Sequence, residues 1–396
     1  MNILFLFAPP INPRRGGVES VTFVLANYFE KRGNNVFFLS RFDVAEDPSN
    51  DIRQFFVPNK TAFNTIENKI FFKNFLQEHK IDILVNQFAI SFDSFSFVEI
   101  AREMNIKIIS AIHNSPLASV LNFTSSKFNL FERYKLKFLI PFFNSHLGKS
   151  LLKFVYKLRY ANLYRRVLIY SDRLFLLSDK YMDQLHFFVK EKYTKKVICM
   201  PNPIPFEPVG IELSKKEKNI LFVSRMLYDQ KRPDFILYIW KKLQDEHKDW
   251  RLIVLGDGPY FEAFKNLARD LALINIEVKG FQPPLEYYKK AKIFCMTSTY
   301  EGFPMVLNES MQYATVPMAF NSFASLTDII DDGINGYVIS PFDLDEYAKK
   351  LSYLMSNDEV VNRLALNAIE KSKKFSMELI GERWIDIMYN LINACN

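Results

Sequence analysis

The sequence predicts an α/β protein with two domains, each built on a parallel β-sheet. Short apolar segments alternate with amphipathic stretches along the whole chain of 396 residues. This alternation is typical of parallel sheets that carry helices on both faces. About a dozen segments have the character of strands, which is many for one sheet of this kind. A proline-rich stretch divides them into two groups, and we therefore expect two Rossmann-like domains.

The order of the predicted elements defines the domain limits. The first group of strands covers residues 3–7, 36–40, 81–86, 107–113, 173–177 and 197–200. The second group covers residues 220–224, 252–256, 276–279, 293–297, 317–320 and 336–339. Between them, PNPIPFEPVG holds four prolines in ten residues, which indicates a linker. We expect an N-terminal domain over 1–205, a second domain over 206–376 and a final helix over 377–396. The sequence leaves open on which of the two domains this helix packs.

Composition excludes several classes of protein. Hydrophobic residues make up 49% and charged residues 24% of the chain, which excludes a largely disordered protein. The three cysteines form no CxxC pair, which argues against a disulfide framework or a zinc site and fits a reducing compartment. The apolar N-terminal run stops at prolines and is expected to be a strand rather than a signal peptide. The longest apolar runs are much shorter than the roughly 20 residues that span a bilayer.

The positive charge of the chain is concentrated in one segment. The formal net charge is +7, yet the segment Ser125–Arg166 alone carries +9 and the remainder carries −2. Within residues 123–170, apolar and aromatic residues recur at helical spacing beside Lys149, Lys153, Lys157 and Arg159. A basic amphipathic helix of this kind suits the surface of an anionic membrane. The alternative is a pair of helices that pack on a domain; no nucleic-acid-binding module is recognisable.

Candidate binding residues of the first domain follow its predicted strands. In open parallel sheets, ligands bind beyond the carboxyl ends of the strands. Gly16 and Gly17 precede a predicted helix over 18–31, where backbone N–H groups can approach an anion; a tight loop without a ligand is the alternative. His113 ends a strand and would point toward the same crevice. A single histidine of this kind more often has a structural role. A binding role for His113 therefore depends on whether the second domain also contains a ligand-binding site.

The second domain holds the stronger pattern. Arg225 and Lys231 follow a predicted strand and could clamp a diphosphate. Glu301 and Glu309 flank a turn and a helix start whose backbone N–H groups, proline excepted, can face a negative group; the turn residues are Gly302, Phe303, Pro304 and Met305. Glu309 could accept hydrogen bonds from hydroxyls such as those of a ribose. A ligand with a diphosphate and hydroxyl-rich ends is a nucleotide sugar.

These motifs resemble a known family. GGVE at 16–19, SRM at 224–226 with Lys231, GDGP at 256–259 and EGFPMVLNE at 301–309 look like family 4 of the retaining glycosyltransferases. The resemblance implies the GT-B fold, in which two Rossmann-like domains face each other across a cleft. It is dense from Ile220 to Leu351 and thin in the first domain. One departure is Arg232-Pro233, where a glycine commonly follows the lysine.

The resemblance also implies roles for single residues. Arg225 and Lys231 would hold the diphosphate of the donor and stabilise the leaving group, and Glu309 would bind the ribose. Glu301, with the backbone of 302–305, would contact the donor sugar, and His113 would contact it from the other domain. Gly16 and Gly17 would lie against the diphosphate or the acceptor.

The implied activity is transfer of a hexosyl or N-acetylhexosaminyl group, with retention, from a UDP-sugar to a lipid-linked or surface glycan. We expect a peripheral protein at the inner face of the cytoplasmic membrane that needs no metal or other cofactor. Asp343-Leu344-Asp345 reads DxD but starts a predicted helix, so it is interpreted as a cap and not as a metal site. The alternatives are a GT-B nucleotide-sugar epimerase and a catalytically silent nucleotide-sugar-binding subunit.

Overall fold

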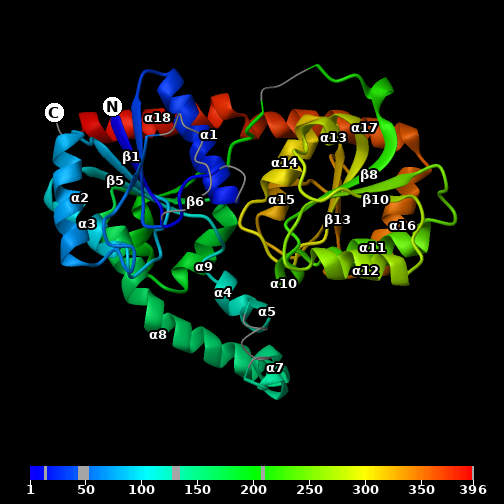
Figure 1. Ribbon diagram of the computed structural model, residues 1–396, viewed down its shortest axis with the longest axis horizontal. Coiled ribbons are helices and arrows are strands. Elements are labelled where there is room, and N and C mark those ends of the chain that lie inside the picture. Colours follow the sequence, from blue (N-terminus) through cyan, green and yellow to red (C-terminus); the bar gives the residue numbers. More distant parts are fainter. Residues whose placement is uncertain (13–15, 43–52, 127–133, 207–209, 395–396) are drawn as a thin grey trace. The chain divides into compact units, whose positions relative to one another are not determined.

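The computed structural model describes residues 1–12, 16–42, 53–126, 134–206 and 210–394 (Figure 1). The described chain forms two compact units. Unit 1 comprises Met1–Val120, Ser145–Pro205 and Ser376–Asn396, and unit 2 comprises Leu121–Asn144 and Phe206–Phe375. The C-terminal segment therefore belongs to the same unit as the N-terminus, although it follows the whole of the second predicted domain.

Unit 1 contains a seven-stranded sheet in which all strands are parallel. Its strands are β1 (Asn2–Leu6), β2 (Asn35–Ser40), β3 (Gln54–Phe56), β4 (Ile83–Asn86), β5 (Lys107–Ile112), β6 (Arg173–Leu176) and β7 (Val197–Cys199). Their order is β3-β2-β1-β4-β5-β6-β7. The sequence predicted all of these strands except β3, which has only three half-buried residues and lies at the sheet edge.

Helices flank this sheet in the pattern expected for alternating strands and helices. They are α1 (Gly17–Lys31), α2 (Ile66–Glu78), α3 (Phe95–Glu103), α8 (His146–Tyr170), α9 (Met182–His186) and α18 (Met377–Asn393), while α4 (Ala118–Leu121) lies at the limit of the unit. The helix α1 ends at Lys31, as the sequence predicted, and Gly33 follows in the left-handed conformation (φ 80°).

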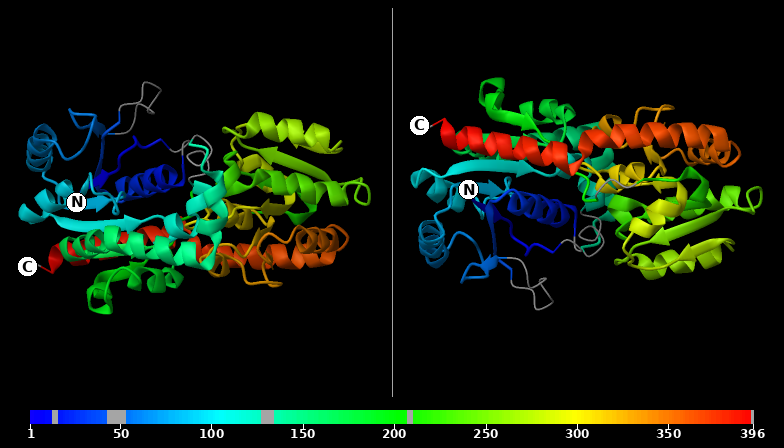
Figure 2. Two further views of the ribbon diagram at one scale, coloured as in Figure 1. Left: turned by 90° about the horizontal axis from the view of Figure 1, so that it is seen from below. Right: turned by 90° about the horizontal axis from the view of Figure 1, so that it is seen from above.

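The C-terminal helix α18 runs along the sheet of unit 1 (Figure 2) and contacts α1. Trp384 packs its ring against Phe29 of α1 and Phe175 of β6. The Tyr28 hydroxyl donates to Glu382 at 2.6 Å. The backbone of Gly381 lies so close to the Tyr28 ring that a Cβ there would be 2.5 Å from ring atoms. Aromatic burial and a tyrosine–carboxylate contact together hold this helix in unit 1.

Unit 2 repeats the same architecture with six parallel strands. These are β8 (Glu217–Val223), β9 (Arg251–Leu255), β10 (Ile276–Val278), β11 (Ala291–Met296), β12 (Val316–Phe320) and β13 (Tyr337–Ile339), in the order β10-β9-β8-β11-β12-β13. All six were predicted. In both sheets the strand order reverses at the centre, so that consecutive strands are added first on one side and then on the other. This reversal lies between β1 and β4 in unit 1 and between β8 and β11 in unit 2. Ligands of doubly wound sheets bind at such a switch point.

The apolar core of unit 2 includes Trp240 and Trp250, both 1% exposed, and the unit also contains several helices. They are α5 (Phe123–Ser126), α7 (Ile140–Asn144), α10 (Tyr228–Lys231), α11 (Pro233–Leu243), α12 (Phe261–Asp270), α13 (Leu285–Lys290), α14 (Met305–Gln312), α15 (Leu326–Ile329), α16 (Leu344–Met355) and α17 (Asp358–Ser372). The core supports the strands whose carboxyl ends carry the candidate site.

The basic segment includes a long helix, α8, and most of the buried residues of this helix lie in its C-terminal half. Its C-terminal half buries Leu163, Tyr164 and Val167 in unit 1. Its N-terminal half extends beyond the sheet of that unit (Figure 1) and leaves Leu147 76% and Leu158 69% exposed. None of the helices in the described part of the chain is long and apolar enough to cross a bilayer.

Candidate functional site

The candidate residues of unit 2 gather at its topological switch point. Arg225 and Lys231 follow β8, and Glu301 follows β11. Because β8 and β11 are parallel neighbours, their carboxyl ends lie at the same sheet edge. The residue types that the sequence singled out, two cations and a carboxylate, therefore meet at the place where doubly wound sheets bind ligands.

Two threonines after β11 fix the position of Lys231. The Thr297 hydroxyl lies 2.9 Å from the Lys231 carbonyl oxygen and 2.8 Å from that of Arg232. The backbone N–H of Thr299 donates to the Gln230 carbonyl at 2.7 Å. Through these contacts the loop after β11 holds α10 from the side, so that the lysine and the residue at 301 are positioned by one hydrogen-bonded unit.

Lys231 and Glu301 form a largely buried ion pair. The Lys231 Nζ and Glu301 Oε1 atoms are 2.5 Å apart, and the two side chains are 15% and 9% exposed. Arg225 is exposed and has no ion-pair partner among the residues that the structure describes. One cation is thus paired beside a carboxylate, while a second remains available to an anion.

Two glycines bring the loop after β9 against the loop that carries Arg225. Gly256 has φ 136°, and a Cβ built there would lie 1.7 Å from the Ser224 carbonyl oxygen. Gly258 has φ 148°, and its Cβ would meet the Met226 backbone at about 3 Å. Residues with side chains are strained in both conformations. The GDG sequence is therefore needed for the close approach that shapes this edge of the sheet.

Arg232 adopts a conformation that explains why glycine is common at its position. Its φ is 42° and its ψ is 55°, in the left-handed region. The guanidinium binds the buried Asp234 carboxylate through two hydrogen bonds of 2.9 and 2.7 Å and stacks over the Phe235 ring at 3.7 Å. These contacts hold the arginine in place of a glycine and leave Lys231 in its position.

Glu309 lies within α14 and is 8% exposed. The hydroxyl of Tyr288, from α13, donates to Glu309 Oε2 at 2.9 Å. Burial raises the pKa of Glu309 to about 7, and the hydrogen bond from Tyr288 lowers it. Tyr288 is fully buried and was not singled out in the sequence, because an isolated tyrosine in a short helix carries no motif. The carboxylate therefore has a dedicated donor that holds one of its oxygens.

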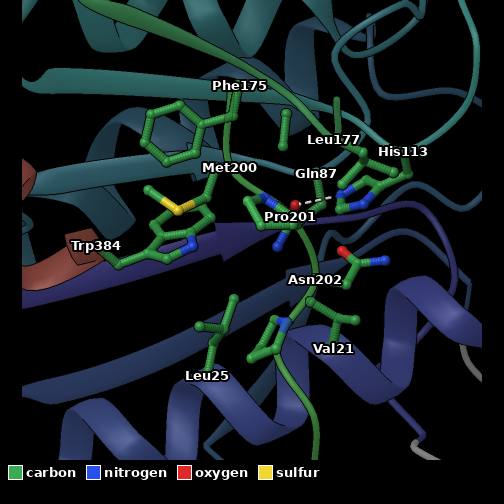
Figure 3. A pocket seen from close by; sticks show the side chains of 12 residues that line it. Val21, Leu25, Gln87, His113, Phe175, Leu177, Met200, Pro201, Asn202 and Trp384 are labelled. Atoms are coloured by element: carbon green, nitrogen blue, oxygen red, sulfur yellow. Dashed lines mark hydrogen bonds between the residues drawn. The ribbon is translucent and has the colours of Figure 1, made fainter. Parts of the chain in front are cut away.

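His113 of unit 1 follows β5 and lines a pocket with Gln87, Leu177 and Asn202 (Figure 3). Its Nε2 lies 2.6 Å from Gln87 Oε1. Burial lowers the pKa of His113 to about 4, so the ring is neutral near neutral pH. Gln87 directly follows β4 and could have been found by the same strand-end argument that selected His113.

Gly16 and Gly17 also belong to unit 1. Gly16 precedes α1 with extended backbone, and Gly17 is its first residue. A Cβ on Gly16 would meet only the flexible end of Glu19, and one on Gly17 would meet nothing within 4 Å. The backbone does not require glycine at either position. The carboxylate of Glu19 lies beside Gly16 at the N-terminus of α1.

The DxD sequence at 343–345 is a helix cap, as expected. The Asp343 side chain accepts hydrogen bonds from the backbone N–H groups of Asp345 and Glu346, and Asp345 pairs with Lys242 at 2.8 Å. Among the described residues, no cluster of histidine, cysteine and acidic side chains has the make-up of a metal site.

Two family models match consecutive parts of the chain. Residues 15–204 match the model described as Glycosyltransferase Family 4, and residues 204–371 match Glycosyl transferases group 1. The chain belongs to family 4 of the glycosyltransferases. The family resemblance that the motifs predicted is confirmed, and the protein is a glycosyltransferase enzyme.

Relatives and solved structures agree with this family. An uncharacterized glycosyltransferase of Haemophilus influenzae is 24% identical over 384 residues, which are 94% of this chain and 96% of that protein. A Campylobacter jejuni enzyme, named as an α-1,4-N-acetyl-D-galactosaminyltransferase that acts on GalNAc-α-(1→4)-GalNAc-α-(1→3)-diNAcBac-PP-undecaprenol, is 26% identical over 57% of this chain and 62% of its own length.

The fold is that of GT-B glycosyltransferases. The apo form of a lipopolysaccharide outer core galactosyltransferase superposes with a TM-score of 0.68 at 19% identity, over the full length of both chains. A mutant of the S. aureus protein TarM, in complex with fondaparinux, α-GlcNAc-glycerol and UDP, superposes with a TM-score of 0.74 at 13% identity over 99% of each chain. The predicted α/β fold with two Rossmann-like sheets is thereby confirmed.

Proposed function

We propose that this enzyme transfers a sugar, with retention, from a UDP-sugar to a lipid-linked or surface glycan. The observation that carries the proposal is the pairing of Lys231 with Glu301 at the switch point of unit 2, where the exposed Arg225 follows the neighbouring strand. The two negative charges of a bound diphosphate would lie beside two cations, Arg225 and Lys231, and Glu301 already holds Lys231 in position. Few ligands other than a nucleotide sugar combine a diphosphate with hydroxyl groups that can donate hydrogen bonds to Glu301 and Glu309.

Different residues of unit 2 bind different parts of the donor in this proposal. Arg225 and Lys231 bind the diphosphate, and Glu309 accepts hydrogen bonds from the ribose hydroxyls through the oxygen that Tyr288 leaves available. Glu301 and the backbone of 302–305 contact the donor sugar. The hydroxyl of Ser325 donates to the Gly302 carbonyl at 2.7 Å, which keeps this turn in place.

Transfer breaks the bond between the anomeric carbon and the diphosphate oxygen. The electron pair leaves with UDP, and the acceptor oxygen forms the new bond to the anomeric carbon on the same face. The proton of the acceptor hydroxyl passes to the departing diphosphate. Pre-positioned cations stabilise charge where it develops, and Arg225 and Lys231 supply this effect without a metal or other cofactor. We propose further that His113 contacts the donor sugar and that Gly16 and Gly17 contact the diphosphate or the acceptor.

The acceptor side involves a membrane in this proposal. Over its 25 residues α8 contains six basic residues and no acidic one. Leu147, Leu151, Phe154 and Leu158 recur at intervals of three and four residues and are all exposed. A second copy of this helix would bring like charges together, whereas an anionic lipid surface attracts them. We therefore place α8 on the inner face of the cytoplasmic membrane, with Lys149, Lys153, Lys157 and Arg159 among the lipid headgroups.

The relatives' names are compatible with this acceptor class. The Campylobacter jejuni relative acts on an undecaprenol-linked glycan, and a Salmonella typhimurium relative, 25% identical over 49% of this chain and 53% of its own length, is a lipopolysaccharide 1,6-galactosyltransferase. Both names describe glycans that are built on lipids.

The test is an incubation of the purified protein with radiolabelled UDP-sugars, with and without a membrane lipid extract. The proposal predicts label in the lipid fraction and release of UDP that depends on the extract. A changed nucleotide sugar without any acceptor would instead indicate an epimerase. Binding of the donor without turnover would indicate a silent binding subunit, and either result contradicts the proposal.

A further inference from the structure

A chain of three hydrogen bonds in unit 1 connects His113 to the first turns of α1. His113 Nε2 lies 2.6 Å from Gln87 Oε1, and Gln87 Nε2 lies 3.1 Å from the Thr22 hydroxyl. That hydroxyl lies 2.7 Å from the Val18 carbonyl oxygen. Thr22 is 0% and Gln87 is 3% exposed, so water has little access to either link.

The Val18 carbonyl oxygen, at the end of this series of hydrogen bonds, determines which group donates in each of them. A carbonyl oxygen cannot donate, so the single hydroxyl proton of Thr22 must point to Val18. The Thr22 oxygen is then an acceptor for Gln87, which must present its NH₂ group to Thr22 and its Oε1 to the histidine. His113 can meet Oε1 only with a proton on Nε2. A backbone carbonyl of α1 therefore determines the tautomer of a histidine that lies 95 residues further along the sequence.

We infer that Gln87 and Thr22 are positioning residues that hold neutral His113 as its Nε2–H tautomer, so that Nδ1 accepts a hydrogen bond from a hydroxyl of the bound sugar. The low pKa of His113 agrees with this, because a neutral ring carries one proton and its position decides what the other nitrogen can bind. No other described residue hydrogen-bonds to the ring. The bond to the sugar rests on the proposed function, whereas the tautomer follows from unit 1 alone.

The pocket beside His113 is lined mainly by apolar side chains on one side. Figure 3 shows Trp384, Phe175 and Met200 on one side of the pocket and the His113–Gln87 pair on the other. Phe175 and Met200 offer the ring no hydrogen-bond partner that could compete with Gln87. In the Nε2–H tautomer, Nδ1 carries a lone pair and can accept from a hydroxyl, whereas a ring with its proton on Nδ1 would require an acceptor there.

The tautomer can be read from long-range ¹H–¹⁵N NMR spectra of ¹⁵N-labelled protein near neutral pH. The His113 signals are assigned by their loss in His113→Asn. We expect a pyridine-type Nδ1 and a protonated Nε2 in the wild type. A proton on Nδ1, or protons on both nitrogens, would overturn the inference.

Two substitutions at Thr22 test whether its hydroxyl sets the orientation of Gln87 and thereby the tautomer of His113. Thr22→Val keeps the shape but removes the hydroxyl that orients Gln87, so a mixture of the two His113 tautomers is expected. Thr22→Ser keeps the hydroxyl and should restore the wild-type spectrum. If Thr22→Val still shows only the Nε2–H tautomer, the Thr22 hydroxyl does not determine the tautomer of His113 and the inference is overturned. If Thr22→Val does not fold, Gln87→Glu serves instead, because its carboxylate stabilises imidazolium and should protonate both nitrogens near neutral pH; an unchanged neutral ring in Gln87→Glu would contradict the contact.

An activity measurement separates this inference from the proposed function. In the transfer assay, Thr22→Val is expected to raise the donor KM about five-fold, the effect of one hydrogen bond, and Thr22→Ser to rescue it. A changed tautomer with an unchanged KM would overturn the contact between His113 and the sugar. Absence of transfer by the wild type would refute the proposed function and leave the NMR result standing.

Discussion

Lys231 Nζ and Glu301 Oε1 lie 2.5 Å apart, although 70 residues separate them in the sequence. Each residue follows one of the two strands that flank the switch point of unit 2, and the threonines after β11 hold the two loops together. The cation that is proposed to stabilise the leaving diphosphate is therefore oriented before the donor binds. Such preorganisation is the largest contribution to catalysis in many enzymes.

Lys231→Ala is expected to reduce turnover at least about 100-fold, because a charge that stabilises the leaving group is lost. It should also lower the free energy of unfolding by about 3 kcal/mol, since Glu301 is left buried without its partner. Transfer assays and urea unfolding measure the two effects. In the double variant Lys231→Met with Glu301→Gln, stability should recover while turnover stays low. Recovery of both would show that the lysine acts only through folding.

Tyr288→Phe is expected to change the pH dependence of donor binding. Glu309 has a pKa of about 7, so its carboxylate is ionised above this pH and accepts from ribose hydroxyls best there. Donor KM should therefore rise as the pH falls through 7. Loss of the Tyr288 hydrogen bond raises the pKa of Glu309 further and should move this rise to higher pH.

Tyr313→Phe is the matched control for this experiment. Tyr313 stacks on Tyr288 with the ring centroids 6.4 Å apart, and both tyrosines interact electrostatically with Glu309. It donates no hydrogen bond to Glu309, so its removal should leave the pH profile in place. The interpretation fails if both variants, or neither, move the midpoint.

Replacing Lys149, Lys153 and Lys157 by glutamine should release the protein from anionic vesicles. Each cation near such a surface contributes about 1 kcal/mol, so the partition coefficient should fall about 100-fold. Salt should weaken wild-type binding because it screens the same charges. Sedimentation with vesicles that contain phosphatidylglycerol measures the effect.

The control variant changes the same number of charges on other helices of unit 1. Lys31, Lys69 and Lys73 lie on α1 and α2, and their replacement by glutamine should lower vesicle binding much less. Equal loss in both triple variants would mean that net charge, rather than α8, determines binding. Unchanged binding in the α8 variant would mean that this helix packs against protein.

Arg232→Gly should be less destabilising than Arg232→Ala by about 1 kcal/mol. Both variants remove the ion pair with Asp234, but only alanine retains the cost of the left-handed conformation. Urea unfolding of the two variants gives the difference directly. Equal stability, or a more stable alanine variant, would show that Arg232 is not strained.

The strands and the site of unit 2 could be predicted from sequence because local patterns specify them. The segments around Ile220 and Ile293 are buried on both faces and therefore read as apolar runs, and Arg225, Lys231 and Glu301 directly follow such runs. The edge strand β3 could not be predicted because Gln54–Phe56 is short and half-buried.

Contacts between distant segments were not predictable. Tyr288 meets Glu309 only through the packing of α13 on the sheet, and Gln87 meets Thr22 across 65 residues. For residues 123–170, the sequence favoured membrane contact and left packing on a domain as the alternative. The exposure of Leu147 and Leu158 favours the membrane, since a packing face would be covered.

UDP release in the presence of acceptor lipid, compared between the wild type and Lys231→Ala, tests the central claim most directly. Equal amounts of folded protein are incubated with a UDP-sugar and membrane lipid extract, and free UDP is quantified over time. The account predicts lipid-dependent UDP release by the wild type and a rate at least about 100-fold lower for Lys231→Ala. Equal rates for the two proteins, or no release by the wild type with any UDP-sugar, would contradict it.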